Sequence, residues 1–234
     1  MGDSLFFTPD GSPALEYAKQ FLSDKGVPFS PIPSGAVTHL LVGVPAKNVP
    51  WESLLSAVSP CITILGGNLT DIPVLKNYRK YDLLQDPFYV SENADITARC
   101  ALHLAAGKLP VTFKDLPVLV VGWGRIGKCL SKHLKALGAS VTVAARNPKD
   151  QAMLRALGYG ITTIQEDMSN YQVLFNTADS CGIRGVPDTC LKIDLATKRG
   201  IEDADTLEAR GLPGKLAPES SGRLIAETVL RLIS

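Results

Sequence analysis

Short runs of consecutive apolar residues recur along this chain and alternate with stretches in which apolar residues repeat every three or four positions. The short runs predict strands that are covered on both faces, and the wider spacing predicts helices that bury one face. Strands that alternate with helices in this way form parallel sheets. The hydrophobic pattern therefore predicts an α/β protein.

In the first 85 or so residues the pattern predicts a small unit with parallel strands. Its first helix has Ser12 as the N-cap, Pro13 in the first turn and Gly26 just past the end. A crossover helix is expected over residues 51–58. Strands are expected at residues 4–8, 39–44 and 61–67.

The rest of the chain continues the alternation with more strands. A helix over residues 91–108 has a polar start and a Gly-Lys end, and it should connect two strand-rich regions. A last helix over 219–233 is expected to cross back to the first domain, by analogy with two-domain dehydrogenases. Other helices are expected at 124–137 and 148–157, and strands at 118–122, 141–145, 173–177 and 191–196.

A G-x-G-x-x-G motif follows the strand at 118–122 and opens the next helix. In this setting the glycines allow a tight turn, a close approach of a pyrophosphate to the backbone, and close packing of the helix on the strand. The free N–H groups at the helix start favour phosphate. The motif predicts a dinucleotide site that includes Gly122, Trp123, Gly124, Arg125, Ile126 and Gly127.

Arg146 stands at the end of the second strand, where an NAD-binding unit usually has an Asp or Glu for the ribose 2′-hydroxyl. A guanidinium can bind a 2′-phosphate through paired charge-assisted hydrogen bonds, and the missing carboxylate removes a repulsion. Asn147 and Lys149 add further donors. The sequence therefore favours NADP(H) over NAD(H) as the cofactor.

The charges of the chain nearly cancel, with 24 basic and 23 acidic residues. This balance predicts no nucleic-acid or membrane partner. The start lacks the features of a signal peptide, and no apolar run is long enough to span a bilayer, so we expect a soluble cytoplasmic protein. The cysteines form no C-x-x-C pair or metal-ligand spacing, and we expect reduced, buried thiols and no metal at Cys61, Cys100, Cys129, Cys181 and Cys190.

The three histidines are His39, His103 and His133, so the part of the chain after residue 133 contains none. A D-2-hydroxyacid dehydrogenase needs a histidine acid/base after its nucleotide domain, so this class is disfavoured. We interpret His39 as structural and expect His133 on the outer face of its helix.

Loops at the carboxyl ends of the later strands should converge on the nicotinamide. They span residues 176–182, 194–200 and 211–222. From them come further cofactor candidates: Asn176, Thr177, Ala178, Ala196 and Pro218.

Candidate substrate ligands come from the same loops and from the connecting helix. Lys198 could hold a carboxylate, or it could be a solvated charge at a turn. Asp95, Arg99 and His103 share a helix face, so Arg99 is either half of an intrahelical ion pair or an anion binder.

The segments 118–147, 174–180, 192–200 and 211–230 together resemble the A subunit of dipicolinate synthase, and the pairing of "DLA" with a later "GLPG-x-x-AP" is the most specific likeness. The resemblance is strong from about residue 80 onward. It implies an N-terminal α/β domain, a Rossmann-type NADP domain, and oxidation of a dihydro- or hydroxytetrahydrodipicolinate to dipicolinate. It also implies a flavoprotein-like B subunit and a role in spore formation.

If that activity holds, the two carboxylates of the cyclic substrate would be bound by Arg99, Lys198, Ser220 and Ser221. No residue stands out as the general base, and the candidates are Asp194 and Glu219. Asp194 could instead cap the adjacent helix or loop.

The chain also departs from the family. Ile96 and Arg99 stand where the family has a proline and a glutamate, and Ala178 is a further difference. Two other readings therefore stay open. One is a shikimate-dehydrogenase-like reductase, which would depend on Lys47, and the other is a non-catalytic NADP(H)-binding sensor or scaffold.

Together these observations predict a Rossmann-type doubly wound parallel sheet preceded by a smaller flavodoxin-like α/β domain. The expected organisation is an N-terminal α/β domain for substrate or partner at residues 1–90, a connecting helix at 91–110, an NADP-binding domain at 111–218, and a C-terminal helix at 219–234 packed on the N-terminal domain. A homo-oligomer is expected.

Overall fold

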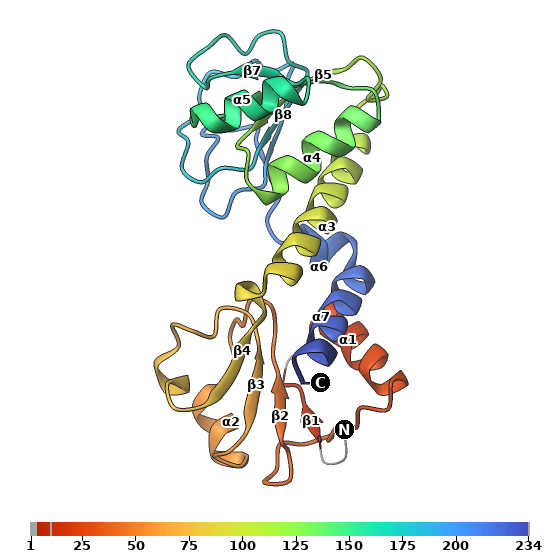
Figure 1. The fold of residues 1–234 in the computed structure, drawn as a ribbon, viewed down its shortest axis with the longest axis vertical. Helices are drawn as coiled ribbons and strands as arrows, with labels where there is room; N and C mark the ends of the chain where they lie inside the picture. Colours follow the sequence, from red (N-terminus) through yellow and green to blue (C-terminus); the bar gives the residue numbers. More distant parts are fainter. Residues whose placement is uncertain (1–3, 10, 234) are drawn as a thin grey trace. The chain divides into compact units, whose positions relative to one another are not determined.

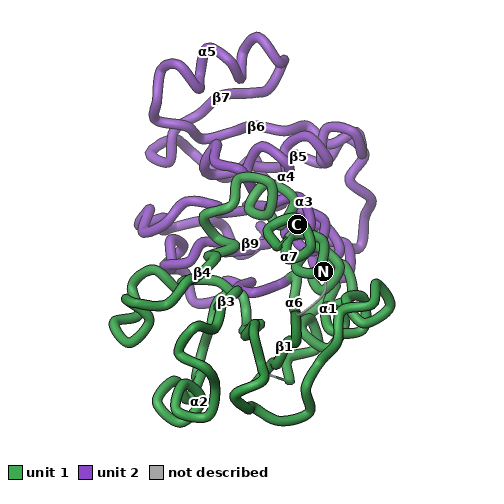
Figure 2. Tube along the Cα trace, turned by 60° about the horizontal axis from the view of Figure 1, so that its bottom comes forward, with its two compact units in different colours: residues 1–93, 213–234 green, residues 94–212 purple. Residues whose placement is uncertain are grey.

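The computed structural model describes residues 4–9 and 11–233. They form two units, one made of residues up to 93 together with 213 onward, and one made of residues 94–212 (Figure 2). Helix α3 (Pro87–Ala106) passes from the first unit into the second. We refer to them as unit 1 and unit 2.

Unit 2 is built on six parallel strands: β5 (Pro117–Val121), β6 (Ser140–Ala144), β7 (Gly160–Thr162), β8 (Val173–Asn176), β9 (Leu191–Asp194) and β10 (Leu207–Glu208). Their order in the sheet is β10-β9-β8-β5-β6-β7, which is the doubly wound order of a Rossmann fold. The direction in which successive strands are added therefore reverses between β5 and β8. This switch point is where such sheets bind nucleotides.

The strands of unit 1 are β1 (Phe6–Phe7), β2 (His39–Leu41), β3 (Thr63–Gly66) and β4 (Arg79–Asp82), all parallel and in the order β1-β2-β3-β4. An isolated parallel bridge joins Phe29 to Phe6 on the free side of β1. With that bridge counted as a short strand, the order becomes 2-1-3-4-5, the flavodoxin-like order. The predicted fold class is confirmed.

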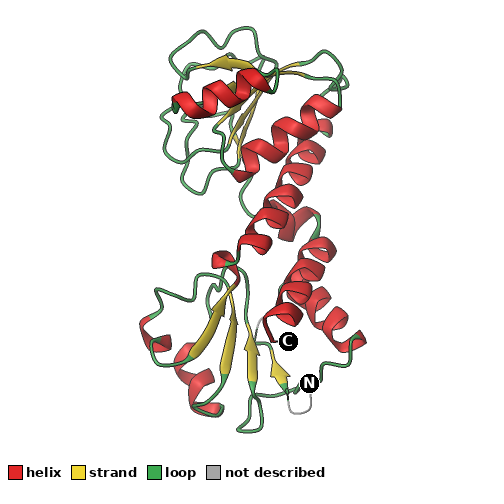
Figure 3. Ribbon diagram, in the orientation of Figure 1, coloured by secondary structure: helices red, strands yellow, loops and turns green. Residues whose placement is uncertain are grey.

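The helices of unit 1 are α1 (Pro13–Asp24), α2 (Trp51–Ala57) and α7 (Pro218–Ile233), with short 3₁₀ turns at Pro73–Leu75 and Leu83–Gln85. Those of unit 2 are α4 (Arg125–Ala136) and α5 (Pro148–Ala156), and the short α6 (Leu212–Leu216) joins the units. Figure 3 shows these elements coloured by type. No helix among the described residues has the length and apolar content to cross a bilayer.

The interior elements lie close to the predicted ranges, but the strands β4, β7 and β10, the helix α6 and the two 3₁₀ turns were not predicted. The three strands lie at the edges of their sheets. An edge strand is covered on fewer sides, so it can carry polar residues, as in the Arg-Lys-Tyr-Asp sequence of β4. The continuous apolar run that identifies an interior strand is then absent.

The expectation of buried cysteines was only partly right. Cys100 and Cys190 are buried, whereas Cys61 is exposed and Cys129 and Cys181 are partly exposed. Burial raises the pKa of Cys190 to about 11, which makes this thiol unreactive at neutral pH. None of the five forms a disulfide.

Helices α1 and α7 pack side by side in unit 1, although nearly two hundred residues separate them (Figure 1). The contact is close at Gly222. A methyl group there would lie 2.5 Å from the carbonyl oxygen of Ala14, 2.5 Å from Cβ of Tyr17 and 2.8 Å from the amide nitrogen of Ala18. Gly222 is therefore required by the approach of two backbones.

We expect Gly222→Ala to lower the free energy of unfolding by about 1–3 kcal/mol, because the added methyl group must push α7 away from α1. Urea denaturation measures the change. Gly214→Ala is the matched control, because a methyl group at Gly214 meets nothing within 4 Å. Equal stability of the two variants would contradict the close packing at Gly222.

Candidate nucleotide site

The glycine loop after β5 is shaped by three glycines with different constraints. Gly122 has a φ of +99°, and a methyl group there would lie 2.7 Å from Oγ1 of Thr177. A methyl group on Gly127 would overlap the carbonyl oxygen of Gly122. Gly124, in contrast, faces open space with nothing within 4 Å. Packing explains Gly122 and Gly127, and room for a ligand explains Gly124.

A cavity of about 710 Å³ opens at the carboxyl ends of β5, β6 and β8. The size is adequate for much of a dinucleotide. The predicted cofactor residues that line it are Gly122, Trp123, Gly124, Arg146, Asn147, Thr177 and Ala178. The structure thus brings the glycine loop, the residues after β6 and the loop after β8 into one site.

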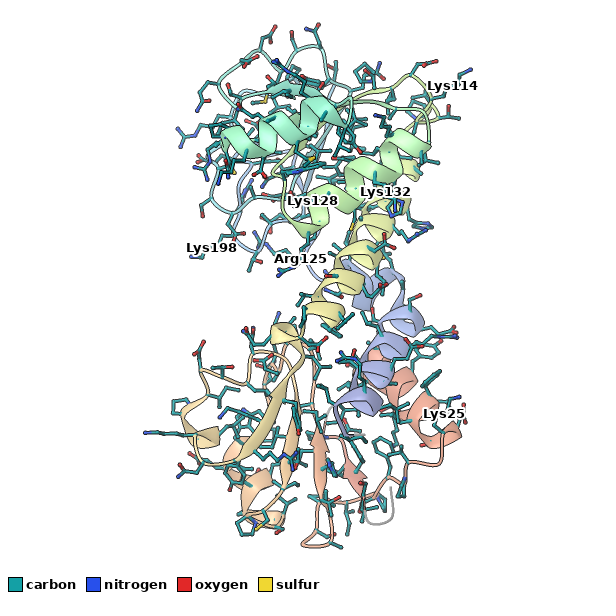
Figure 4. The ribbon with its side chains drawn as sticks, viewed as in Figure 1. Lys25, Lys114, Arg125, Lys128, Lys132 and Lys198 are labelled. Atoms are coloured by element: carbon teal, nitrogen blue, oxygen red, sulfur yellow. The ribbon has the colours of Figure 1, made fainter. Side chains whose placement is uncertain are left out.

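Helix α4 begins at this cavity with Gly124 as its N-cap, and no side chain caps its first turn. Its first N–H groups therefore have no acceptor within the helix. They carry the positive end of the helix dipole, as a pyrophosphate site requires. Arg125 lies on the surface here and does not line the cavity (Figure 4).

Arg146 is exposed at the end of β6 and lines the cavity. It makes no hydrogen bond or ion pair within the described part of the chain. Its charge reaches the Cys181 thiol, whose pKa is raised by burial and held back by the guanidinium. Asn147 caps α5 by accepting a hydrogen bond from the Lys149 backbone N–H at 2.9 Å. Arg146 is therefore a cation with an unused set of donors.

Several predicted cofactor residues lie behind the cavity wall or outside it. Ile126, Gly127 and Lys149 do not line the cavity, and neither do Asn176 and Ala196, which are buried. Pro218 belongs to unit 1. Thr177, which does line the cavity, donates a hydrogen bond from Oγ1 to the Val121 carbonyl at 2.8 Å and so joins the loop after β8 to the end of β5.

The sequence missed seven lining residues outside strands: Ala145, Asp150, Thr163, Ile164, Asp179, Ser180 and Cys181. Thr163 and Ile164 follow β7, the edge strand that the hydrophobic pattern did not show. Residues 179–181 lie in a loop that was predicted to converge on the site, so their neighbours Asn176 to Ala178 already pointed to them. Asp150 had no signal, because an acid in the first turn of a helix is ordinary.

The buried carboxylate of Asp194 organises the loops beside the cavity. Its Oδ1 accepts hydrogen bonds from Asn176 Nδ2 at 2.8 Å and from the Ala196 N–H at 3.1 Å. Its Oδ2 accepts from the N–H groups of Gly200 at 2.7 Å and Ile201 at 3.1 Å. Both oxygens are occupied, so the structure favours loop capping over a general-base role for Asp194.

Asp95 pairs with Arg99, the candidate anion binder, on α3. The Arg99 Nε donates to Asp95 Oδ2 at 2.7 Å, as the helical spacing predicted for an ion pair. The other oxygen of Asp95 lies 2.5 Å from His133 Nε2 on α4, so the expectation that His133 lies on the outer face was wrong. Partial burial raises the pKa of Asp95, but the hydrogen bonds from Arg99 and His133 outweigh it and lower the pKa overall.

The remaining candidate in unit 2 is Lys198, which is exposed on the loop after β9 (Figure 4). Its backbone N–H donates to Asp179 Oδ1 at 2.9 Å, and its ammonium has no partner within the described residues. It therefore remains free to bind an anion.

The other candidates lie at the start of α7 in unit 1. Ser220 is exposed, and Glu219 is exposed with its carboxylate 3.5 Å from Arg223. Ser221 is only 6% exposed, and its hydroxyl has no hydrogen-bond partner in the described chain. These residues belong to a different unit from the cavity.

His39 has the structural role that the sequence predicted. Its ring stacks on Phe6 with 4.6 Å between ring centres, and Nδ1 lies 2.8 Å from the Thr38 hydroxyl. Burial and the charge of Arg79 lower its pKa, so the ring is neutral at pH 7. Lys47 and His103 are exposed. Within residues 4–9 and 11–233, no group of three or more His, Cys, Asp or Glu is placed to hold a metal.

Asp194→Asn is expected to lower the free energy of unfolding by about 2–4 kcal/mol, because an amide nitrogen would face the N–H groups of Gly200 and Ile201. Hydrogen exchange should also speed up over residues 195–201. Asp188→Asn, at an exposed position with no hydrogen bond or ion pair in the described chain, is the control. An unchanged exchange rate in both variants would show that the loops do not depend on this carboxylate.

The sequence is similar to the A subunit of dipicolinate synthase from Bacillus subtilis, with 27% identity over 158 residues. This match covers 61% of the chain and 53% of the relative, so the chain spans about half the length of the curated relative. A glutamyl-tRNA reductase from Helicobacter hepaticus is 30% identical over 131 residues, which cover 49% of the chain and 30% of that protein. No protein-family model matches.

The fold is similar to the crystal structure of the dipicolinate synthase A subunit from Bacillus halodurans, with a TM-score of 0.82 and 20% identity over 100% of this chain and 98% of that one. A transhydrogenase from Sinorhizobium meliloti has a TM-score of 0.70 with 15% identity, covering 98% of this chain and 93% of that one. The architecture is thus shared with oxidoreductases. The sequence similarity and the shared fold together place this chain among the relatives of the A subunit of dipicolinate synthase.

Proposed function

We propose that the protein is an NADP-dependent oxidoreductase of the dipicolinate synthase A type, which oxidises a dihydro- or hydroxytetrahydrodipicolinate to dipicolinate. The observation that carries this proposal is the cavity at the switch point of unit 2, where Gly124 leaves open space and Arg146 offers an unpaired guanidinium. The similarity to the A subunit of dipicolinate synthase supports the proposed substrate class.

The residues of the cavity fit a phosphorylated dinucleotide. The N–H groups at the start of α4 would hold the pyrophosphate, and the missing side chain of Gly124 leaves room for it. Arg146 would bind the 2′-phosphate through two of its donors. The bound nicotinamide would accept the hydride.

Oxidation of the dihydro substrate removes a hydride and a proton and makes the ring aromatic. The hydroxytetrahydro form must also lose a molecule of water to reach the dihydro level. The protein therefore has to orient the ring and hold its two carboxylates. In unit 2, Lys198 is better suited to a carboxylate than Arg99, because Asp95 already neutralises Arg99.

The reaction also needs a group that accepts the proton. Asp194 has both oxygens filled by hydrogen bonds, which leaves Glu219 as the candidate from the sequence. Its pairing with Arg223 at 3.5 Å is loose and exposed, so the carboxylate is accessible.

The Bacillus subtilis relative is one subunit of a synthase, which implies that a second polypeptide completes that enzyme. We propose that this chain works with a flavoprotein-like B subunit, as a homo-oligomer, in the cytoplasm of a spore-forming cell. The near balance of charge and the absence of a membrane-spanning helix among the described residues are compatible with such a role.

A coupled assay tests the reaction. Hydroxytetrahydrodipicolinate is generated in situ from pyruvate and aspartate semialdehyde, the protein is added with NADP⁺ or NAD⁺, and reduced cofactor and dipicolinate are followed with and without a B-type partner. NADP-dependent dipicolinate formation above the spontaneous background supports the proposal. Tight cofactor binding with no dipicolinate in any arm would contradict the reaction and favour a sensor or scaffold.

Arg146→Ala is expected to weaken NADPH binding roughly 10- to 100-fold and to change NADH binding little, because only the 2′-phosphate loses its charged donors. Isothermal titration calorimetry measures both affinities. Lys149→Ala is the control, because it removes a positive charge in the first turn of α5 at a residue that does not line the cavity. The NADPH and NADH affinities of this variant should stay near those of the wild type. A similar loss in both variants would mean that Arg146 acts only through general charge.

A further inference from the structure

The adenosine end of the cavity carries two opposite charges. Arg146, Asn147 and Asp150 all line it, whereas Lys149, the other cation of this segment, does not. Asp150 and Arg146 therefore line the same space with opposite charges. The negative charge of Asp150 therefore largely offsets the positive charge of Arg146 that the sequence predicts for this end of the cavity.

The carboxylate of Asp150 lies at the positive end of the α5 dipole and has no other structural task in the described chain. It is the third residue of α5, from which an acid can reach back to the N–H of the N-cap residue. In this helix the cap is made by Asn147 instead, and its neighbour Gln151 donates to the Ala145 carbonyl at 2.7 Å. Asp150 makes no hydrogen bond or ion pair with any described residue. Its oxygens are left for a ligand.

The two charges favour different riboses. A carboxylate accepts hydrogen bonds from ribose hydroxyls and repels a 2′-phosphate, which carries close to two negative charges at pH 7. A guanidinium does the reverse. A site with both groups in reach can bind either form of the dinucleotide.

We propose that Asp150 is a second determinant of cofactor choice, which opposes Arg146 and gives the site a working affinity for NAD(H) as well as NADP(H). This inference rests on the proposed dinucleotide function. It predicts that the wild-type protein discriminates only weakly between the two cofactors and that Asp150 sets the ratio.

The test is a comparison of NADPH and NADH dissociation constants by calorimetry, with competition by 2′-AMP and AMP to isolate the ribose subsite. Asp150→Asn keeps the shape and removes the charge. It should tighten NADPH roughly tenfold and weaken NADH several-fold, because a repulsion is lost for one and a charged acceptor for the other. The 2′-AMP and AMP affinities should change in the same directions.

Asp188→Asn is the charge-matched control, because Asp188 is exposed and does not line the cavity. Asp150→Ala is a second variant that removes the acceptor as well as the charge, and circular dichroism verifies folding in each case. An unchanged NADPH/NADH ratio in both Asp150 variants overturns the inference while leaving the proposed function intact. Failure of the wild type to bind either dinucleotide overturns both.

Discussion

The site depends on one buried carboxylate. Asp194 is the last residue of β9, and its four hydrogen bonds tie Asn176 at the end of β8 to the loop over residues 196–201. Asn176 in turn fixes the Ala178 backbone through bonds to its N–H and its carbonyl. The loop after β8, which lines the cavity, is thus held by hydrogen bonds to residues at the ends of the strands. A carboxylate can do this at low cost because every one of its bonds is charge-assisted and buried.

The glycine loop also lines the cavity, and its geometry depends on Thr177, the residue that follows β8. Thr177 bonds to the carbonyl of Val121 and lies where a side chain on Gly122 would be. The positive φ of Gly122 and the contact between Gly127 and the Gly122 carbonyl then set the start of α4. Segments that are distant in the sequence therefore meet at the switch point, because the order of the strands in the sheet places them there. The cavity is already formed by these contacts, so a ligand can bind without ordering the loops first.

The sequence predicted the interior of both sheets and the position of the glycine loop, because buried parallel strands and a strand–turn–helix motif leave a strong local pattern. It did not predict β4, β7 and β10, since edge strands share their composition with loops. Side-chain partners were harder still. The spacing of Asp95 and Arg99 revealed their ion pair, but no local pattern could show that His133, thirty-eight positions away, also contacts Asp95. The place of Asp150 in the cavity depends on how α5 leaves β6, which the order of residues does not show.

The packing of α7 on α1 has a consequence for how the chain is made. Unit 2 is a continuous segment, whereas unit 1 is assembled from both ends of the described chain. During synthesis, unit 2 has all its strands before α7 exists, but α1 must wait for residues 218–233 to cover its apolar face. Unit 1 is therefore the last to be completed, although its first strands leave the ribosome before unit 2 does, and the apolar face of α1 stays open to aggregation until α7 has been made.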